Sequence, residues 1–490
     1  MKNILIAIRS IFKKGRHNVM KIVSLGIGLA VGLVLIAKVY FEQSYDDFYP
    51  DRDRVYQVWA KYQQNGGELK DYPQTSGGIA PTMQQQIPEI ETVTRYTSFG
   101  DWTFTMTDTK MKYSGRCIIA DSCFFDILPR PMLIGNAKEV LSTPMYVLIS
   151  SRIAKNIGGD VIGKNFTVDN SPGRTMTIGG VFEEVPENSH SRYDVIVSMA
   201  SAGRFMWEGS PTNMLGNDRY ISYVKLHKGV NPLALEEQVR TFVNSYFPPE
   251  EQQKVGLSID FSFHKLDNLH KELPQVKRMT WILSLLAFAL IFTAVMNYIL
   301  IVISSIVNRS KEVAVHKCYG ASENNIHGMM FGEALVHIVL SLILALLLIL
   351  AFRGTVEELL ATSLDSLLLS NGSLVLLGIC ILVFFVSGFM PGSLYARIPV
   401  ASAFRNYREN KRIWKKALLL VQFVATGFLV TMLVFVARQY TFMVNDRPGY
   451  AYENLAYCGL AGVDSTSRAK ILDEVMRLPG VAAATTVFQL

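Results

Sequence analysis

Five long apolar runs constrain this 490-residue chain more than any other feature. Each holds about twenty residues with almost no charge, and a helix of that length can cross the roughly 30 Å hydrocarbon core of a bilayer. Lys38 interrupts the first run, and Glu333 and His337 interrupt the third. Buried core helices are the alternative, but the lengths disfavour them. We therefore expect a polytopic α-helical membrane protein with five transmembrane helices, at residues 22–41, 279–307, 326–352, 374–396 and 417–437.

Lysine and arginine concentrate in three short segments outside these runs. Residues 1–21, 308–325 and 397–416 together hold sixteen Lys and Arg but only three acids, although the whole chain carries a net charge of +7. Basic loops stay on the cytoplasmic side, so the N-terminus and the linker 401–416 are predicted to be cytoplasmic. Residues 42–276 and the tail 438–490 are then outside. We interpret this positive charge as a topology signal rather than a nucleic-acid patch, and expect no nucleic-acid partner.

The first 21 residues are basic and amphipathic. Apolar residues recur at helical spacing, at Ile4, Leu5, Ile8, Ile11 and Phe12. Two interpretations stay open: a helix lying on membrane lipid at the inner leaflet, or charge that only sets the topology. No small-residue cleavage site follows the first apolar run, so we expect an uncleaved anchor.

Residues 42–276 have the pattern of a soluble domain. Alternating residues predict strands at 175–178 and 221–225, and helical periodicity predicts helices at 80–86 and 234–246. We expect an α+β fold with two subdomains. The stretch 158–165 spells a phosphate loop, except that Asn165 replaces the hydroxyl residue that binds Mg²⁺. A strand is predicted after it, at 166–168, where a phosphate loop needs a helix, so we expect no nucleotide site.

Other polar residues of this domain do not form a recognisable catalytic, cofactor or metal site. Four acids lie near its start, at Asp46, Asp47, Asp51 and Asp53. They lack the glycine and final Glu of a calcium loop, and we expect them to be solvated. His190 and His264 lack metal-ligand spacing. Cys117 and Cys123 could form a disulfide, but two buried free thiols are the preferred interpretation.

The loop 308–325 has the pattern of a short charged surface helix. Val313, His316, Lys317 and Gly320 keep i, i+3, i+4, i+7 spacing. Gly320 is predicted to end this helix, and Ser322 to cap the next one. Two functions stay open, a docking element for a cytoplasmic partner and a simple connector. The candidate docking residues are Arg309, Lys311, Glu312, His316, Lys317 and Gly320.

Two polar residues lie inside the third apolar run. Glu333 and His337 are four residues apart and share one helix face. Charges at mid-bilayer are costly, so such residues face protein or water. Helix packing or snorkelling of Glu333 towards the surface is preferred over a proton relay, because no partner is evident in the other runs.

The chain also repeats itself weakly. The segment 84–94, centred on Ile87-Pro88, resembles 474–485, centred on Leu478-Pro479, at an offset of 391. The first and fifth apolar runs are separated by a similar offset, and both follow basic clusters. A second copy thus begins near Arg412. Two full copies would need roughly 780–800 residues, so we expect the chain to be partial, with 438–490 as the start of a second outside domain.

Taken in order, these features resemble the MacB/FtsX-type permeases of ABC transporters, in the form with two fused repeats and no fused ATPase. The loop RSKEVAVHKCYGAS at 309–322 resembles the family's "RKEIGIRKxLGAS" coupling element. His316 departs from the usual Arg, and Cys318-Tyr319 from an aliphatic pair. Glu333 matches a Glu that the family often carries. Further similar segments are YDDFYP (45–50), DRVYQV (53–58), IPEI (87–90), IGK (162–164), GVF (180–182), PENSH (186–190), SGFMP (387–391) and LVQF (420–423).

The resemblance implies a fold and a function. Residues 42–276 would be a MacB-like periplasmic core domain, and residues 279–400 an FtsX-like transmembrane domain, in the bacterial inner membrane. The chain would be a non-enzymatic permease that transmits the motion of a separate, dimeric cytoplasmic ATPase to its outside domain. The load would be a peptide, lipoprotein, drug or envelope partner, with an outer-membrane partner also open. A membrane sensor or scaffold and an ion-coupled secondary transporter are the alternatives.

Overall fold

The computed structural model describes residues 17–168, 171–216, 218–368, 372–396, 413–445, 454–460, 463 and 465–486. The chain divides into two compact units. One holds the long helices, and the other, within 45–270, holds the sheet. The predicted surface helix within residues 1–21 falls largely on residues 1–16, and most of the linker 401–416 on 401–412, which lie outside the described residues.

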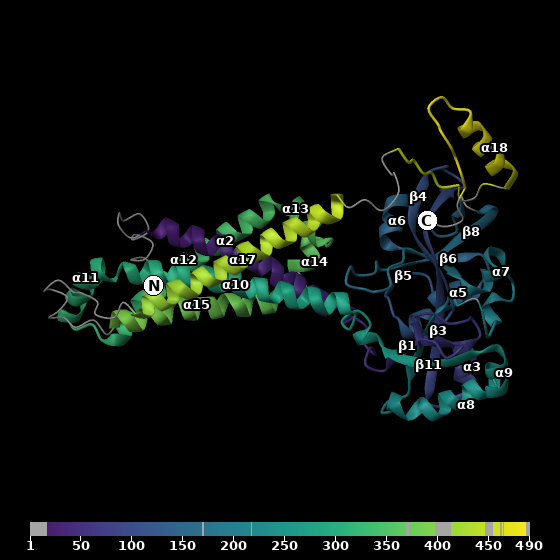
Figure 1. Ribbon diagram of the computed structural model, residues 1–490, viewed down its shortest axis with the longest axis horizontal. Coiled ribbons are helices and arrows are strands. Elements are labelled where there is room, and N and C mark those ends of the chain that lie inside the picture. Colours follow the sequence, from purple (N-terminus) through teal and green to yellow (C-terminus); the bar gives the residue numbers. More distant parts are fainter. Residues whose placement is uncertain are drawn as a thin grey trace. The chain divides into compact units, whose positions relative to one another are not determined.

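Five helices of the first unit are long and apolar enough to cross a membrane, by length and composition, among the described residues. They coincide with the five apolar runs and run side by side in Figure 1. The polytopic helical fold is therefore confirmed. The helices are α2 (Asn18–Gln43), α10 (Pro274–Ser304), α12 (Glu323–Ala351), α15 (Ser373–Ala396) and α17 (Ile413–Asn445).

Small residues let α2 pack closely against α10. A Cβ atom on Gly28 would lie 2.3 Å from the Cβ of Ala294, and one on Gly32 would lie 2.4 Å from Ile291. Glycine at this spacing lets two helix backbones approach where a larger residue would hold them apart. Leu25 and Leu29 of α2 are fully buried in the same cluster as Ile299 of α10.

Shorter helices connect the long ones. Helix α11 (Ile306–Cys318) follows α10 directly at Ser305, and α13 (Arg353–Leu360) and α14 (Leu364–Leu368) stand between α12 and α15. Figure 1 shows α11 at one end of the helix bundle, and α13 and α14 nearer the other. The predicted loop helix of 308–325 is thus confirmed as a helix.

The second unit, here called the core domain, contains one mixed sheet of eleven strands with helices packed on it. Its path is β11-β1-β10-β3-β4-β9-β6-β8-β5; β2 pairs with β1, and β7 with β3 and β8. Most neighbours are antiparallel, but β4–β9 and β6–β8 are parallel. The strands are β1 (Val55–Gln64), β2 (Lys70–Tyr72), β3 (Ile90–Met106), β4 (Lys112–Ala120), β5 (Met132–Ile134), β6 (Tyr146–Ser150), β7 (Asn165–Val168), β8 (Ser171–Phe182), β9 (Val195–Ser198), β10 (Ile221–Leu226) and β11 (Leu257–Lys265).

The strands and helices predicted in this domain are present. Strands β8 and β10 contain the two alternating segments, and β7 follows the phosphate-loop-like stretch as expected. The two expected subdomains are not separate, because strands β3 and β4 join both parts of the sheet. The helices are α3 (Ile79–Gln86), α4 (Phe124–Ile127), α5 (Ala137–Ser142), α6 (Ser151–Ile157), α7 (Ala202–Phe205), α8 (Glu236–Tyr246) and α9 (Pro249–Val255).

The turn found after α3 occurs again in the tail. The N–H of Ile90 donates to the carbonyl of Ile87, and the N–H of Val481 donates to the carbonyl of Leu478, at the same offset of 391. Helix α18 (Ser465–Met476) precedes the second turn as α3 precedes the first. The repeat noted in the sequence therefore has the same local structure.

Candidate coupling and transmission sites

One face of helix α11 packs against the other helices of the helical unit. Val313 and Ala314 are fully buried in the main apolar cluster of the bundle. The hydroxyl of Tyr395, near the end of α15, donates to the carbonyl of Val302 at 3.2 Å and lies 3.2 Å from the hydroxyl of Ser305. Ser305 is the residue at which α10 ends and α11 begins. Tyr395 thus holds the junction between α10 and α11.

The end of α11 has the geometry that the sequence predicted. Gly320 adopts a left-handed φ of 85°. Its N–H donates to the carbonyl of Lys317, and the N–H of Ala321 donates to that of His316, both at 3.0 Å. This pair of bonds is a Schellman motif, which favours glycine at that position. The hydroxyl of Ser322 then caps α12 by accepting from the N–H of Asn325.

The exposed side of α11 includes residues beyond the candidates that the sequence suggested. Val313 is buried, whereas Lys311, Val315 and Tyr319 lie on the exposed side, one turn apart. Val315 is 43% exposed and Tyr319 89% exposed. Exposed apolar and aromatic side chains on a helix beside a charged one suit a protein contact. Sequence reasoning missed Val315 and Tyr319, although their spacing from Lys311 was visible.

The remaining candidate residues of α11 surround this face. His316 is exposed, and Glu312 and Lys317 are half-buried. Arg309 belongs to α11, but its side chain lies outside the described part of the structure. Their function stays a prediction.

The two intramembrane polar residues are packed between helices. Glu333 is 8% exposed and His337 3% exposed, so Glu333 does not snorkel to the surface. Nδ1 of His337 and the hydroxyl of Tyr298 on α10 lie 3.1 Å apart and share a hydrogen bond. His337 therefore has a polar partner in a neighbouring helix, which the sequence did not reveal, and helix packing accounts for its position.

A third polar group lies near the C-terminal end of α2. Nζ of Lys38 is 2.7 Å from the carboxylate of Glu42 and donates to the hydroxyl of Thr362, between α13 and α14, at 2.8 Å. All three residues are buried. The contact ties α2 to the α13–α14 segment just before the chain leaves the helical unit. A lysine inside an apolar run was the only sequence signal for it.

The chain that continues from α2 is fixed at once in the core domain. Asp46 is fully buried, with a left-handed φ of 60°. Its carboxylate accepts from the hydroxyl of Ser189 at 3.1 Å and lies 2.7 Å from Nδ1 of His190, and its N–H donates to the carbonyl of Asn188. The expectation that this acidic residue is solvated was wrong for Asp46. Its partners, more than 140 residues later in the chain, contact and bury it.

Asp46, His190 and Tyr223 are linked in the sequence of a catalytic relay, but the tyrosine at its end is buried. Because the Asp46 carboxylate only accepts, Nδ1 of His190 donates to it, and Nε2 contacts the hydroxyl of Tyr223. Tyr223 is fully buried, and Ser191, whose hydroxyl lies 3.4 Å from Nε2 of His190, is 4% exposed. Burial raises the pKa of Tyr223 well above its usual value, which also disfavours a nucleophilic phenolate. The group is a structural connection.

Cysteine and metal chemistry contribute nothing further to these sites. Cys117 and Cys123 are free thiols, as the preferred interpretation had it, and burial raises the pKa of both. Within the described residues, no three His, Cys, Asp or Glu side chains come together as a metal site.

Comparison with known proteins identifies the class. Residues 20–242 match the family model of the MacB-like periplasmic core domain, and residues 284–400 match the FtsX-like permease C-terminal model. Together these matches cover more than half of the chain. The protein is a bacterial membrane protein and an ABC transporter permease subunit. It belongs to the MacB/FtsX-type permease family, whose members generally work with a separate ATPase and are not themselves catalytic.

Solved structures are similar to part of the chain. A domain assigned to a permease protein from Porphyromonas gingivalis has 33% identity, covering 44% of this chain and 91% of that one (TM-score 0.41). The periplasmic region of MacB from Actinobacillus actinomycetemcomitans has 15% identity over 45% and 92% (0.30). The extracellular domain of the noncanonic ABC-type transporter YknZ from Gram-positive bacteria has 11% over 42% and 98% (0.30). No curated protein matches the chain.

Proposed function

We propose that this permease transmits ATP-driven motion of a cytoplasmic ATPase to its core domain outside the membrane. The N-terminus and α11 lie in the cytoplasm in this proposal, and α11 is the docking element. The observation that carries it is the structure of α11, whose inner face is fully buried among the long helices while Val315 and Tyr319 stand exposed. In this proposal, a force that the ATPase applies to α11 is passed to the long helices, because Val313 and Ala314 are packed among them.

The path from α11 to the core domain follows contacts within each unit and the chain between them. Tyr395 and Ser305 join α11 to α15 and α10, and α2 packs against α10 along its glycines. Lys38 then fixes the end of α2 to Thr362. The chain leaves α2 after Gln43, and Asp46 engages the core domain three residues later. Because only two residues separate Gln43 from Asp46, motion of α2 would be passed to the segment 188–190.

Two alternatives lead to different results. A sensor or scaffold would reposition the helices without turnover, so a hydrolysis-deficient ATPase would leave its function intact. An ion-coupled transporter would use the buried His337–Tyr298 pair, and its transport would follow a pH gradient without ATP.

The test is native co-purification in mild detergent, with mass spectrometry of the retained proteins. Tyr319→Asp should reduce the amount of retained ABC ATPase at least about tenfold, because it places a charge in the contact. A Glu312/Lys317 double alanine variant should also lose ATPase. Tyr457→Asp is the matched control, since Tyr457 is 88% exposed in the tail. Equal retention by the Tyr319 and Tyr457 variants, or no ATPase with the unaltered chain, would overturn the docking role.

A further inference from the structure

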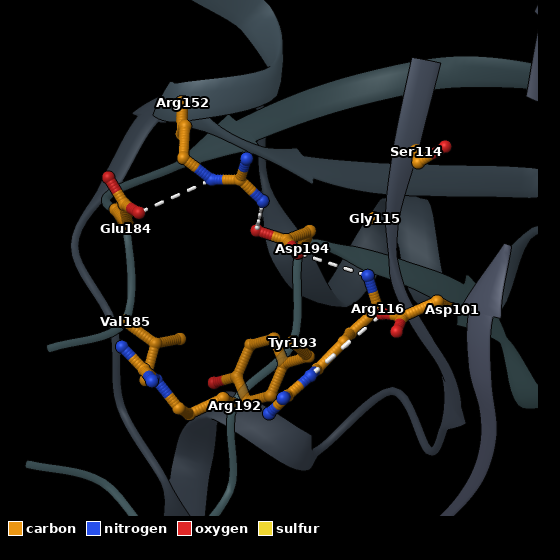
Figure 2. Close-up of a pocket in the computed structure, with 10 residues that line it drawn as sticks. All are labelled: Asp101, Ser114, Gly115, Arg116, Arg152, Glu184, Val185, Arg192, Tyr193 and Asp194. Atoms are coloured by element: carbon orange, nitrogen blue, oxygen red, sulfur yellow. Dashed lines mark hydrogen bonds and ion pairs between the residues drawn. The ribbon is translucent and has the colours of Figure 1, made fainter. Parts of the chain in front are cut away.

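The core domain contains a polar pocket of about 320 Å³ that the transmission path does not use. It is lined by residues of β3, β4, α6 and the segment 184–194. Three of these are arginines, Arg116, Arg152 and Arg192. Figure 2 shows Arg152 with Glu184 on one side of the pocket, and Arg116 and Arg192 beside the ring of Tyr193 on the other.

On one side of the pocket, the charge of Arg152 is balanced by two carboxylates. Nη2 of Arg152 lies 2.6 Å from the carboxylate of Asp194, and Nε lies 3.4 Å from Glu184. Asp194 also accepts from the peptide N–H of Arg116 at 3.0 Å. These contacts occupy Arg152 and hold the wall in place.

The other two guanidinium groups are available. Nε of Arg116 is 3.9 Å from Asp101, and their side chains are 56% and 77% exposed, so solvent weakens this pair. Arg192 makes no hydrogen bond or ion pair to any residue in the part of the chain that the structure describes. A guanidinium presents up to five N–H donors in a planar fork that matches a carboxylate or a phosphate.

The pocket is preformed rather than loosely assembled. Tyr193 is 3% exposed, and its ring forms a buried wall. A Cβ atom on Gly115 would lie 2.9 Å from the Cβ of Asp194, so the backbone of β4 approaches this wall closely. Buried walls, with Arg192 and the weakly paired Arg116 at the rim, reduce the ordering cost of binding.

We propose that this pocket binds a single oxyanion group, a carboxylate or a phosphate, of a small extracytoplasmic ligand through Arg116 and Arg192. Asp101 and Glu184 line the same pocket, and their charge disfavours a polyanion. The site is independent of the ATPase-coupling proposal and goes beyond it. The pocket also lies close in sequence to the buried group at the start of the core domain. Arg192 is two residues from His190, whose Nδ1 contacts Asp46.

The test uses the full chain in lipid nanodiscs at low ionic strength, with calorimetric titration of inorganic phosphate and, separately, of N-acetylglycine as a carboxylate. At least one probe should bind saturably at one site, and the probe that binds identifies the group. Arg192→Gln and Arg116→Gln should each weaken binding about tenfold or more, as expected for a lost charge-assisted hydrogen bond. Arg240→Gln, an exposed arginine of α8 outside the pocket, should change it less than twofold.

A second measurement on the unaltered protein locates the site. Hydrogen exchange should slow at residues 114–116 and 184–194 when the binding probe is present. The proposal is overturned if neither probe binds saturably, if the Arg192 and Arg240 variants weaken binding alike, or if protection appears elsewhere. None of these results bears on ATPase docking, so the two proposals fail separately.

Discussion

Lys38 and Glu42 form an ion pair of 2.7 Å on consecutive turns of α2, with side chains only 9% and 6% exposed. Lys38→Met should lower the free energy of unfolding by about 3–5 kcal/mol, because it leaves a buried carboxylate without its ammonium partner. Thermal unfolding of the full chain in detergent measures this. The Lys38→Met/Glu42→Met double variant should lose less than the sum of the single losses. Additive losses would show that the pair is not coupled, and Lys416→Met, on the exposed face of α17, should change little.

The close packing of α2 on α10 predicts a size limit at Gly28. Gly28→Ala should destabilise the helical unit by about 1–3 kcal/mol, because the new methyl group would overlap that of Ala294. Adding Ala294→Gly should restore part of the loss. Gly378→Ala on α15 is the control, since a Cβ atom there meets nothing within 4 Å. If both single variants unfold at the same temperature, the helices are not in this contact.

Acid should weaken the start of the core domain through Asp51. Hydrogen bonds from Arg54 and Lys225 lower its pKa from 3.8 to about 2. A lowered pKa gives stabilisation that is present above pH 3.8 and lost as the pH falls towards 2. Its size is about 1 kcal/mol or less, because the Asp51 side chain is 38% exposed. Unfolding temperatures of Asp51→Asn and the unaltered protein should therefore differ at pH 6 and converge near pH 2. A difference that persists there would contradict this.

Two exposed cysteines report the proposed topology without added residues. Cys318 ends α11 and Cys458 lies in the tail. In intact spheroplasts, a membrane-impermeant maleimide should label Cys458 in a variant that retains only this cysteine. A variant that retains only Cys318 should react only after the membrane is opened. Labelling of Cys318 in intact spheroplasts would contradict the proposed orientation and place α11 outside the membrane.

The helices and the coupling loop could be predicted from the sequence because their signals are local. Apolar length marked all five long helices, and Gly320 and Ser322 marked the boundary between α11 and α12. The partners of Asp46 and His337 could not be predicted, because both pairings join residues far apart in the chain. The exposed apolar residues of α11, Val315 and Tyr319, were not selected from the sequence for a different reason. Spacing identifies a stripe but not which stripe the rest of the bundle covers, and here Val313 faces inward.

The central claim is that ATP binding by an ATPase docked on α11 moves the core domain. Hydrogen exchange should be compared in the assembled complex with its ATPase, in nanodiscs, between nucleotide-free and ATP-trapped states. We expect exchange to change both in α11 and in the segments 45–54 and 186–191, which contain Asp46 and its partners. The Tyr319→Asp variant should lose both changes and the Tyr457→Asp control should keep them. Changes confined to α11, with unaltered exchange around Asp46 in the unaltered protein, would contradict transmission through α2.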